Sequence, residues 1–127
     1  VDIVVVTGRS GSGKATALAA LEDDGSNDCI AVVSTGGMSH QISGARFGIA
    51  NETLDEWFLS KIGNDFSELI DLPQEELMRL GGTEAAELAL WFSMRGALSD
   101  NISEVYRYYT FPAITGCGVI VFDDHAV

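Results

Sequence analysis

The strongest constraint on the fold is a short apolar segment that stops abruptly at a pair of glycines. Residues 29–34 read Cys-Ile-Ala-Val-Val-Ser, a run rich in β-branched residues that is typical of a buried strand. Gly36 and Gly37 follow, and glycine lets a backbone turn sharply because it tolerates angles that other residues avoid. The turn leads to His40, one of two histidines in the chain. The carboxyl end of a buried strand is where open α/β sheets place their ligand sites.

A second apolar run near the N-terminus predicts a strand–helix–strand unit. Residues 3–6 are expected to form a strand, residues 15–21 a helix, and residues 30–33 the next strand. Two strands joined by a helix are expected to pair in parallel. The chain has 127 residues, of which 46% are hydrophobic, and no repeat or linker-like tract divides it. We therefore predict a single domain over residues 1–127.

The remainder of the chain predicts several helices followed by two strands. Thr53 and Glu56 have the spacing of a capping box, and the apolar stripe that follows reaches Ile62. Further helices are expected over residues 65–70, 73–81 and 84–95, and strands over residues 105–111 and 119–122. The predicted fold class is α/β, with helices packed on a mixed or mostly parallel sheet.

The charge of the chain excludes several classes of partner. It carries 19 Asp and Glu against 7 Lys and Arg, for a formal net charge of −12. A field of this sign repels nucleic-acid backbones and anionic membranes, so we expect neither as a partner. No run approaches membrane-spanning length, and no charged region precedes residues 1–6 as in a signal peptide. These features predict a cytoplasmic protein.

A glycine-rich stretch between the first predicted strand and helix is one candidate site. Gly8, Gly13 and Lys14 fit the GxxxxGK pattern of a phosphate loop, which would bind ATP or GTP with Mg²⁺. Ala15 stands where that loop has a serine or threonine hydroxyl for the metal. Residues 1–25 resemble the N-terminal segment of nucleotide-binding proteins of the RNase-adapter family. A plain strand-to-helix turn is the alternative interpretation.

His40 and Glu87 are the other two candidates. His40 is flanked by Ser39 and Gln41, which could fix its ring, and histidine side chains suit acid–base work near neutral pH. Glu87 lies in the apolar stretch of residues 85–92, which leaves little solvated face, so its carboxylate is expected to be paired, hydrogen-bonded or bound to a metal. The alternatives are a structural histidine, and a salt bridge from Glu87 to one of three arginines, Arg46, Arg79 or Arg95.

With these two residues in view, residues 29–124 resemble the C-terminal part of a known enzyme family. The family is that of the class III extradiol ring-cleavage dioxygenases, of the protocatechuate 4,5-dioxygenase β-subunit type. The matching stretches fall in order along the chain and are residues 35–41 (Thr-Gly-Gly-Met-Ser-His-Gln), 44–48, 82–91, 94–100, 108–112 and 115–118.

The resemblance implies a division of roles between the two candidates. His40 would be the acid–base residue, and Glu87 would be a ligand of a non-haem Fe(II) that family members use to open catechol-type rings with O₂. The implied partners are a small aromatic substrate and O₂. The family's two iron-binding histidines have no counterpart here, because His125 matches neither, so a partner chain or a missing N-terminal half would supply them. The alternatives are a nucleotide-binding module and a non-catalytic structural or interaction domain.

Overall fold

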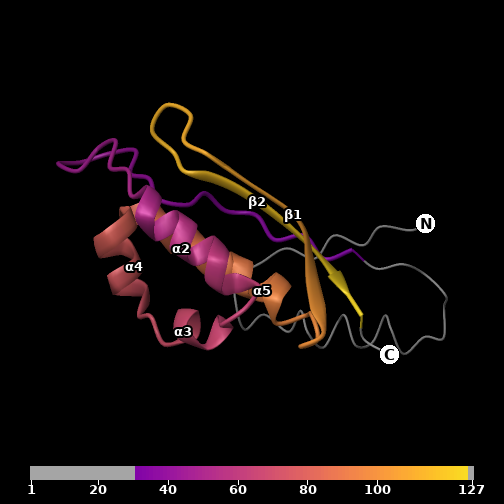
Figure 1. The fold of residues 1–127 in the computed structure, drawn as a ribbon. Helices are drawn as coiled ribbons and strands as arrows, with labels where there is room; N and C mark the ends of the chain where they lie inside the picture. The colour runs from indigo at the N-terminus through magenta and orange to yellow at the C-terminus, as the bar shows by residue number, and fades with distance from the viewer. Residues whose placement is uncertain (1–30, 126–127) are drawn as a thin grey trace.

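The computed structural model describes residues 31–125, in which helices precede a β-hairpin (Figure 1). The elements are α2 (Glu52–Ile62), α3 (Phe66–Ile70), α4 (Gln74–Gly81), the 3₁₀ helix η1 (Thr83–Leu90), α5 (Trp91–Arg95), β1 (Ile102–Thr110) and β2 (Cys117–Asp124). Helix α2 packs against β2, so the helices cover one face of the hairpin. This arrangement is compatible with the predicted α/β class. None of the helices described is long and apolar enough to span a membrane.

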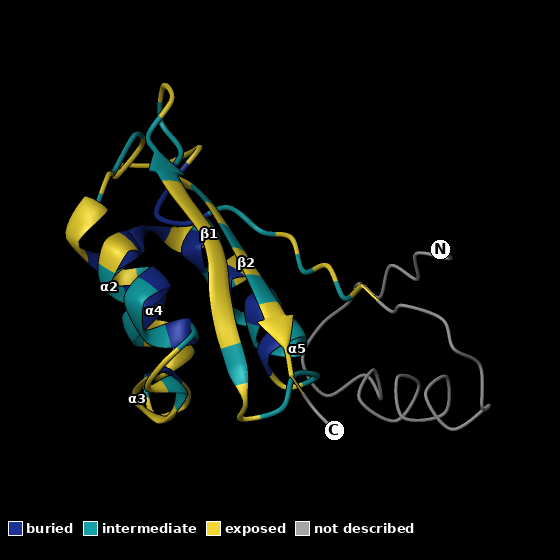
Figure 2. Cartoon of the chain, turned by 45° about the vertical axis from the view of Figure 1, so that its right-hand side comes forward, coloured by how far each residue is buried: buried dark blue, intermediate teal, exposed yellow. Residues whose placement is uncertain are grey.

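The hairpin confirms the two C-terminal strands that the sequence predicts. β1 and β2 pair antiparallel, from Ile102 opposite Asp124 to Thr110 opposite Cys117. Residues along β2 alternate between exposed and partly buried, as expected when one face of a strand lies on a core. Exposed residues run along most of β1, whereas β2 combines exposed and partly buried residues (Figure 2). The sheet of the described residues is thus antiparallel, whereas residues 3–6 of the predicted parallel pair lie outside them.

Residues 31–34 do not form the strand that the sequence predicts at this position. Val33 is 42% exposed, and no strand is assigned in this segment. A groove of about 810 Å³ lies between these residues and residues 118–124 of β2. A strand needs a neighbour about 4.8 Å away to complete its hydrogen bonds, and no ladder pairs residues 31–34 with another strand of the described chain. The prediction of a buried strand is therefore wrong for residues 31–33.

Helix α2 has the predicted stripe but a different start. Asn51 is the N-cap, and its side-chain oxygen accepts a hydrogen bond from the Leu54 N–H at 3.0 Å. Thr53 lies inside the first turn, so the predicted capping box is wrong, because Asn51 already satisfies the free N–H group. The stripe itself is confirmed, since Leu54, Phe58 and Ile62 are all buried.

A single hydrophobic cluster joins the helices to the turn that carries His40. The Phe58 and Trp91 rings meet edge to face, with centroids 5.8 Å apart. Met38 is fully buried in the same cluster and Leu88 of η1 packs there as well. Apolar side chains from distant parts of the sequence therefore fix the turn against α2 and η1.

The segment from residue 83 to residue 95 is not one α-helix. It begins as the 3₁₀ helix η1 and continues as the short α5, and Thr83 is its first residue rather than its cap. Gly82 packs against the His40 backbone and Glu87 packs against Gly36, so η1 is held at two points along the turn. A 3₁₀ helix rises about 2.0 Å per residue against about 1.5 Å for an α-helix, so it spans a longer distance between such contacts. The helices predicted over residues 65–70 and 73–81 are confirmed.

Candidate active site

The turn that carries His40 is buried and tied to the end of the hairpin. Met38, Ser39, His40 and Gln41 are each at most 8% exposed. The Met38 N–H donates to the Gly116 carbonyl and the Gly116 N–H donates to the Ser39 carbonyl, both at 2.9 Å. His40 and Thr115 form an isolated antiparallel bridge. The histidine thus stands on a short, firmly paired piece of backbone.

The backbone of the turn sets the protonation pattern of the His40 ring. Nδ1 lies 2.8 Å from the Met38 carbonyl oxygen. A carbonyl can only accept, so Nδ1 carries the hydrogen in the neutral ring and Nε2 keeps its lone pair. The flanking side chains do not hold the ring as the sequence suggested, because Ser39 bonds to Asp55 and Gln41 bonds to the Ser43 carbonyl. Nε2 is therefore the nitrogen able to accept a proton.

Two glycines bring Glu87 to the same turn. The Gly37 N–H donates to Glu87 Oε2 at 2.8 Å, and a Cβ on Gly37 would lie 2.6 Å from Cε1 of the His40 ring. Gly36 has a φ of +151°, and a Cβ there would lie 2.7 Å from the Glu87 carbonyl oxygen. Both positions need glycine because side chains would collide with the site itself. Gly37 contacts both predicted site residues, so the structure brings them together.

Glu87 is more exposed than the sequence predicts. The apolar composition of residues 85–92 suggested an enclosed carboxylate, but Glu87 is exposed while Ala85 and Leu88 point into the core. The tight winding of η1 puts its buried face on those residues and leaves Glu87 beside the turn. The expectation of little solvated face is therefore wrong for Glu87, whereas the expected hydrogen bond is present, from the Gly37 N–H of the His40 turn.

The salt-bridge alternative for Glu87 is also wrong. Arg46 donates to the Arg79 carbonyl at 2.7 Å, and the Arg79 guanidinium pairs with Glu76 at 2.6 Å. Arg95 donates to the carbonyl of Ser99 at 3.1 Å. The three arginines are thus engaged elsewhere, and the contact that the structure gives the Glu87 carboxylate is a backbone N–H.

Sequence reasoning missed the carboxylate that lies beneath the turn. Asp55 is fully buried and accepts hydrogen bonds from the Ser39 N–H at 2.8 Å, the Ser39 hydroxyl at 2.7 Å and the Tyr109 hydroxyl at 2.8 Å. Burial raises the pKa of Asp55 above its ordinary 3.8, although hydrogen bonds from Ser39 and Tyr109 and the charge of His40 oppose this shift. A signal was present in the sequence, because Asp55 falls on the face of α2 that also carries Phe58 and Ile62.

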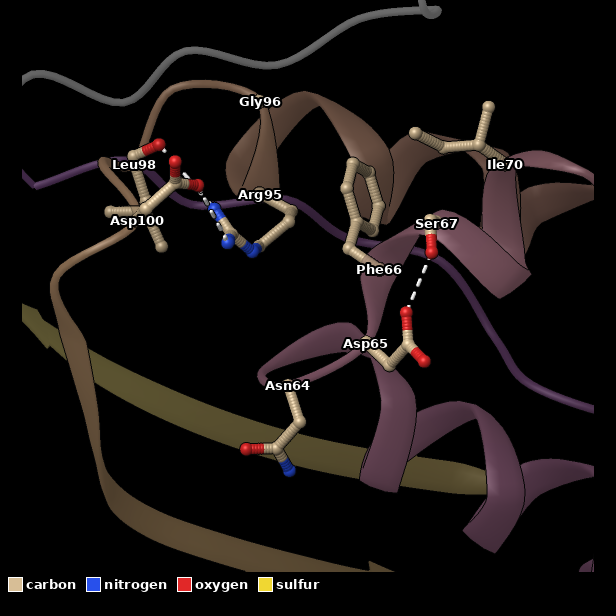
Figure 3. Close-up of a pocket in the computed structure, with 9 residues that line it drawn as sticks. All are labelled: Asn64, Asp65, Phe66, Ser67, Ile70, Arg95, Gly96, Leu98 and Asp100. Carbon is tan, nitrogen blue, oxygen red and sulfur yellow. Dashed lines mark hydrogen bonds and ion pairs between the residues drawn. The ribbon is translucent and has the colours of Figure 1, made fainter.

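Two concavities in the described part of the chain are lined by neither His40 nor Glu87. One is the groove between residues 31–34 and β2. The other is a depression of about 470 Å³ beside α3 and α5 (Figure 3). There Arg95 reaches towards Leu98 and Asp100, while Asp65 accepts a hydrogen bond from Ser67 at 2.6 Å. Arg95 also lies over the Phe66 ring, 5.5 Å from its centroid, so its contacts are those of a structural residue.

Residues 31–125 do not provide a complete metal site. No group of three or more His, Cys, Asp or Glu side chains in this part of the chain is arranged to hold a metal ion. The site brings one carboxylate, Glu87, next to one imidazole whose Nδ1 is already bonded to a carbonyl. A two-histidine, one-carboxylate iron site needs two further imidazoles. The described residues therefore fit one part of such a site.

Comparison with known proteins gives the class to which this arrangement belongs. The family model for the catalytic LigB subunit of aromatic ring-opening dioxygenase matches residues 13–121. The chain belongs to this family, which confirms the resemblance drawn from the motifs around His40 and Glu87. It is also 38% identical over 95 residues to gallate dioxygenase of Pseudomonas putida. That match covers 75% of this chain and 28% of the relative, so the chain spans less than a third of the relative's length.

The phosphate-loop hypothesis gains nothing from the structure or the comparisons. Gly8, Gly13 and Lys14 lie outside the described residues. The family match begins at residue 13, so Lys14 and the predicted helix after it fall within the dioxygenase family rather than beside it. Nucleotide binding by this loop stays a prediction from the sequence.

Proposed function

We propose that this chain forms the proton-transfer side of an active site that opens the ring of a catechol-type substrate with O₂. His40 is its acid–base residue, and Glu87 is one ligand of Fe(II). The observation that carries the proposal is the position of Gly37, which bonds to the Glu87 carboxylate and lies against the His40 ring. Family membership and the similarity to gallate dioxygenase support the substrate class.

The chemistry assigned to this chain is a proton transfer at His40 Nε2. The bond from Nδ1 to the Met38 carbonyl keeps Nε2 unprotonated in the neutral ring, ready to take a proton from an aromatic hydroxyl group. The same nitrogen can return the proton later in the reaction, as a general acid. The iron, when bound, supplies the activation of O₂ and substrate. Two histidines from a partner chain or from another part of a longer protein would complete its ligands.

A chimaeric enzyme tests this proposal. Residues 31–125 of this chain replace the matching part of gallate dioxygenase, and ring-opened product and O₂ consumption are measured after anaerobic addition of Fe(II). We expect turnover by the chimaera and little or none by the isolated chain. His40→Gln is expected to lower kcat by about 10²-fold or more, the contribution typical of general acid–base catalysis. Glu87→Gln is expected to weaken the binding of iron.

His125 provides the matched control. It is exposed and its Nε2 lies 2.8 Å from the Ser103 hydroxyl, far along the chain from the turn. His125→Gln in the same chimaera is expected to leave kcat within about twofold. A folded chimaera whose activity is unaffected by His40→Gln would refute the role of His40.

A further inference from the structure

The His40 turn rests on a buried polar network that the proposed chemistry does not use. Its centre is Asp55, whose two oxygens accept three hydrogen bonds, two of them from Ser39. The Ser39 hydroxyl also accepts a bond from the Asn51 N–H at 2.9 Å. Asn51 in turn caps α2 and donates from its side chain to the Leu80 carbonyl at 3.1 Å. One carboxylate therefore connects the turn to α2, and through Asn51 to α4.

A buried carboxylate is costly, so this network calls for an explanation beyond ordinary packing. An apolar residue on the buried face of α2 would fill the same space without the cost of removing charge from water. Asp55 instead holds both the main-chain N–H and the side chain of Ser39, the residue between Met38 and His40. These bonds hold both the main chain and the side chain of Ser39. They therefore also fix the two peptide bonds that join Ser39 to Met38 and to His40.

The geometry of His40 depends on that same short stretch of backbone. Its ring is held by the carbonyl of Met38, only two residues earlier. That carbonyl can reach Nδ1 only while the backbone between the two residues keeps its present shape. A rotation about Ser39 would break the bond at Nδ1 and allow the hydrogen to move to Nε2.

We propose that Asp55 is a positioning residue for His40, because its grip on Ser39 keeps the Met38 carbonyl on Nδ1 and so leaves Nε2 free to take a proton. Tyr109 has the supporting role of completing the hydrogen bonds of the carboxylate from β1. The catalytic meaning of this role rests on the proposed function. The tautomer of the His40 ring is nevertheless measurable in a protein that turns over no substrate.

The test is nitrogen NMR of the complete chain labelled with ¹⁵N-histidine, recorded at about pH 8. Long-range ¹H–¹⁵N spectra distinguish a ring with its hydrogen on Nδ1 from one with its hydrogen on Nε2. The two histidines are assigned with His125→Gln. In the wild type we expect His40 in the Nδ1–H form alone, and a wild-type ring in the Nε2–H form would overturn the proposal at once.

Two variants of Asp55 then probe the network. Asp55→Ala removes both acceptor oxygens. Asp55→Asn keeps the shape of the side chain but places an NH₂ group, which cannot accept, opposite the Ser39 and Tyr109 hydroxyls that donate to Asp55 in the wild type. We expect the single-tautomer signature of His40 to be lost in the first and weakened in the second, with His125 unchanged. A folded Asp55 variant that keeps the pure Nδ1–H form would overturn the proposal. If the alanine variant does not fold, the asparagine variant decides.

Tyr109→Phe is the matched control, because it removes one donor from Asp55 and leaves both bonds to Ser39. We expect this variant to retain the Nδ1–H form. Loss of the tautomer to the same extent as in the Asp55 variants would show that general loosening, and not the hold on Ser39, controls the ring. The two proposals can fail separately. If the Asp55 variants lose the tautomer but the unsubstituted chimaera is inactive, the proposed function is refuted and the positioning of His40 by Asp55 still holds.

Discussion

Two adjacent stretches of the chain, residues 31–35 and residues 38–41, differ sharply in how they are held. Residues 38–41 are each at most 8% exposed and bond to α2, to the end of the hairpin and to the 3₁₀ helix. In residues 31–35, Val33 is 42% exposed, and β2 stands across a groove. The turn that carries His40 is therefore held by many hydrogen bonds from within residues 31–125. The segment leading into it is held by fewer, among them the bond from the Met94 N–H to the Ser34 hydroxyl at 3.1 Å.

This difference separates the part of the site that the described residues determine from the part that they leave open. His40, Glu87 and Asp55 obtain their geometry from hydrogen bonds within the range 31–125. The apolar segment has the composition of a buried strand but not the neighbours of one. The hydrogen bonds of the turn can thus be tested directly in this chain. For residues 31–35, the test is how little a substitution changes the free energy of unfolding.

The largest expected effect comes from the core beneath the turn. Phe58 is fully buried, contacts the Trp91 ring and shares a cluster with Met38. Phe58→Ala is expected to lower the free energy of unfolding by about 3–5 kcal/mol, through lost burial and the cavity left behind. Urea unfolding followed by circular dichroism measures the change. Phe47→Ala, at a position 61% exposed, is the control and is expected to change little. If the two substitutions lowered the free energy of unfolding equally, Phe58 would not be part of a core that stabilises the turn.

A smaller loss is expected from a backbone position that touches the turn from the other side. Gly82 has a φ of +97°, and a Cβ there would overlap the carbonyl oxygen of His40. Gly82→Ala is expected to cost about 1–3 kcal/mol from backbone strain, with the displacement of His40 added to it. The measurement combines urea unfolding with the NMR signature of the His40 ring. Gly96→Ala, where φ is −71°, is the control. An unchanged His40 tautomer in Gly82→Ala would show that this contact does not position the turn.

The pH dependence of stability tests the buried carboxylate itself. Burial raises the pKa of Asp55 in the folded state, so folding favours its protonated form. The unfolded chain then loses this proton at a lower pH than the folded chain. Stability contributed by Asp55 is therefore complete below its ordinary pKa of 3.8 and is lost as the pH rises through the raised value.

The corresponding experiment compares the wild type with Asp55→Asn, which cannot titrate. As the pH rises above about 4, the free energy of unfolding of the wild type is expected to fall relative to that of the variant. His40 and Tyr109 are the titratable groups that act on Asp55, and burial raises the pKa of Tyr109 further above the range of the experiment. Repeating the comparison in a His40→Gln background removes the influence of His40, the other titratable group. A difference that is constant with pH would show that the pKa of Asp55 is the same in the folded and unfolded chains.

The sequence predicted those features that depend on local pattern. The apolar run of residues 119–122 predicted the strand found as β2, and the glycine pair before His40 marked the turn. It failed where packing between distant segments decides the outcome. An apolar helix does not reveal which side faces the core, so Glu87 was expected to have little solvated face. Asp55 was overlooked because a carboxylate on a helix usually faces water, and its donors come from residues 16 and 54 positions away.

The smallest effect on stability is expected in residues 31–35, and it tests the difference between this segment and residues 38–41 most directly. Val33→Ala removes apolar atoms from a side chain that is 42% exposed beside the groove. We expect the free energy of unfolding to change by less than about 0.5 kcal/mol, as for ordinary surface substitutions. Leu59→Ala, at a position 1% exposed, serves as the buried counterpart and is expected to cost about 2–5 kcal/mol. If Val33→Ala costs as much as Leu59→Ala, the leading segment is buried in solution, and the groove beside β2 is closed by atoms from outside residues 31–125.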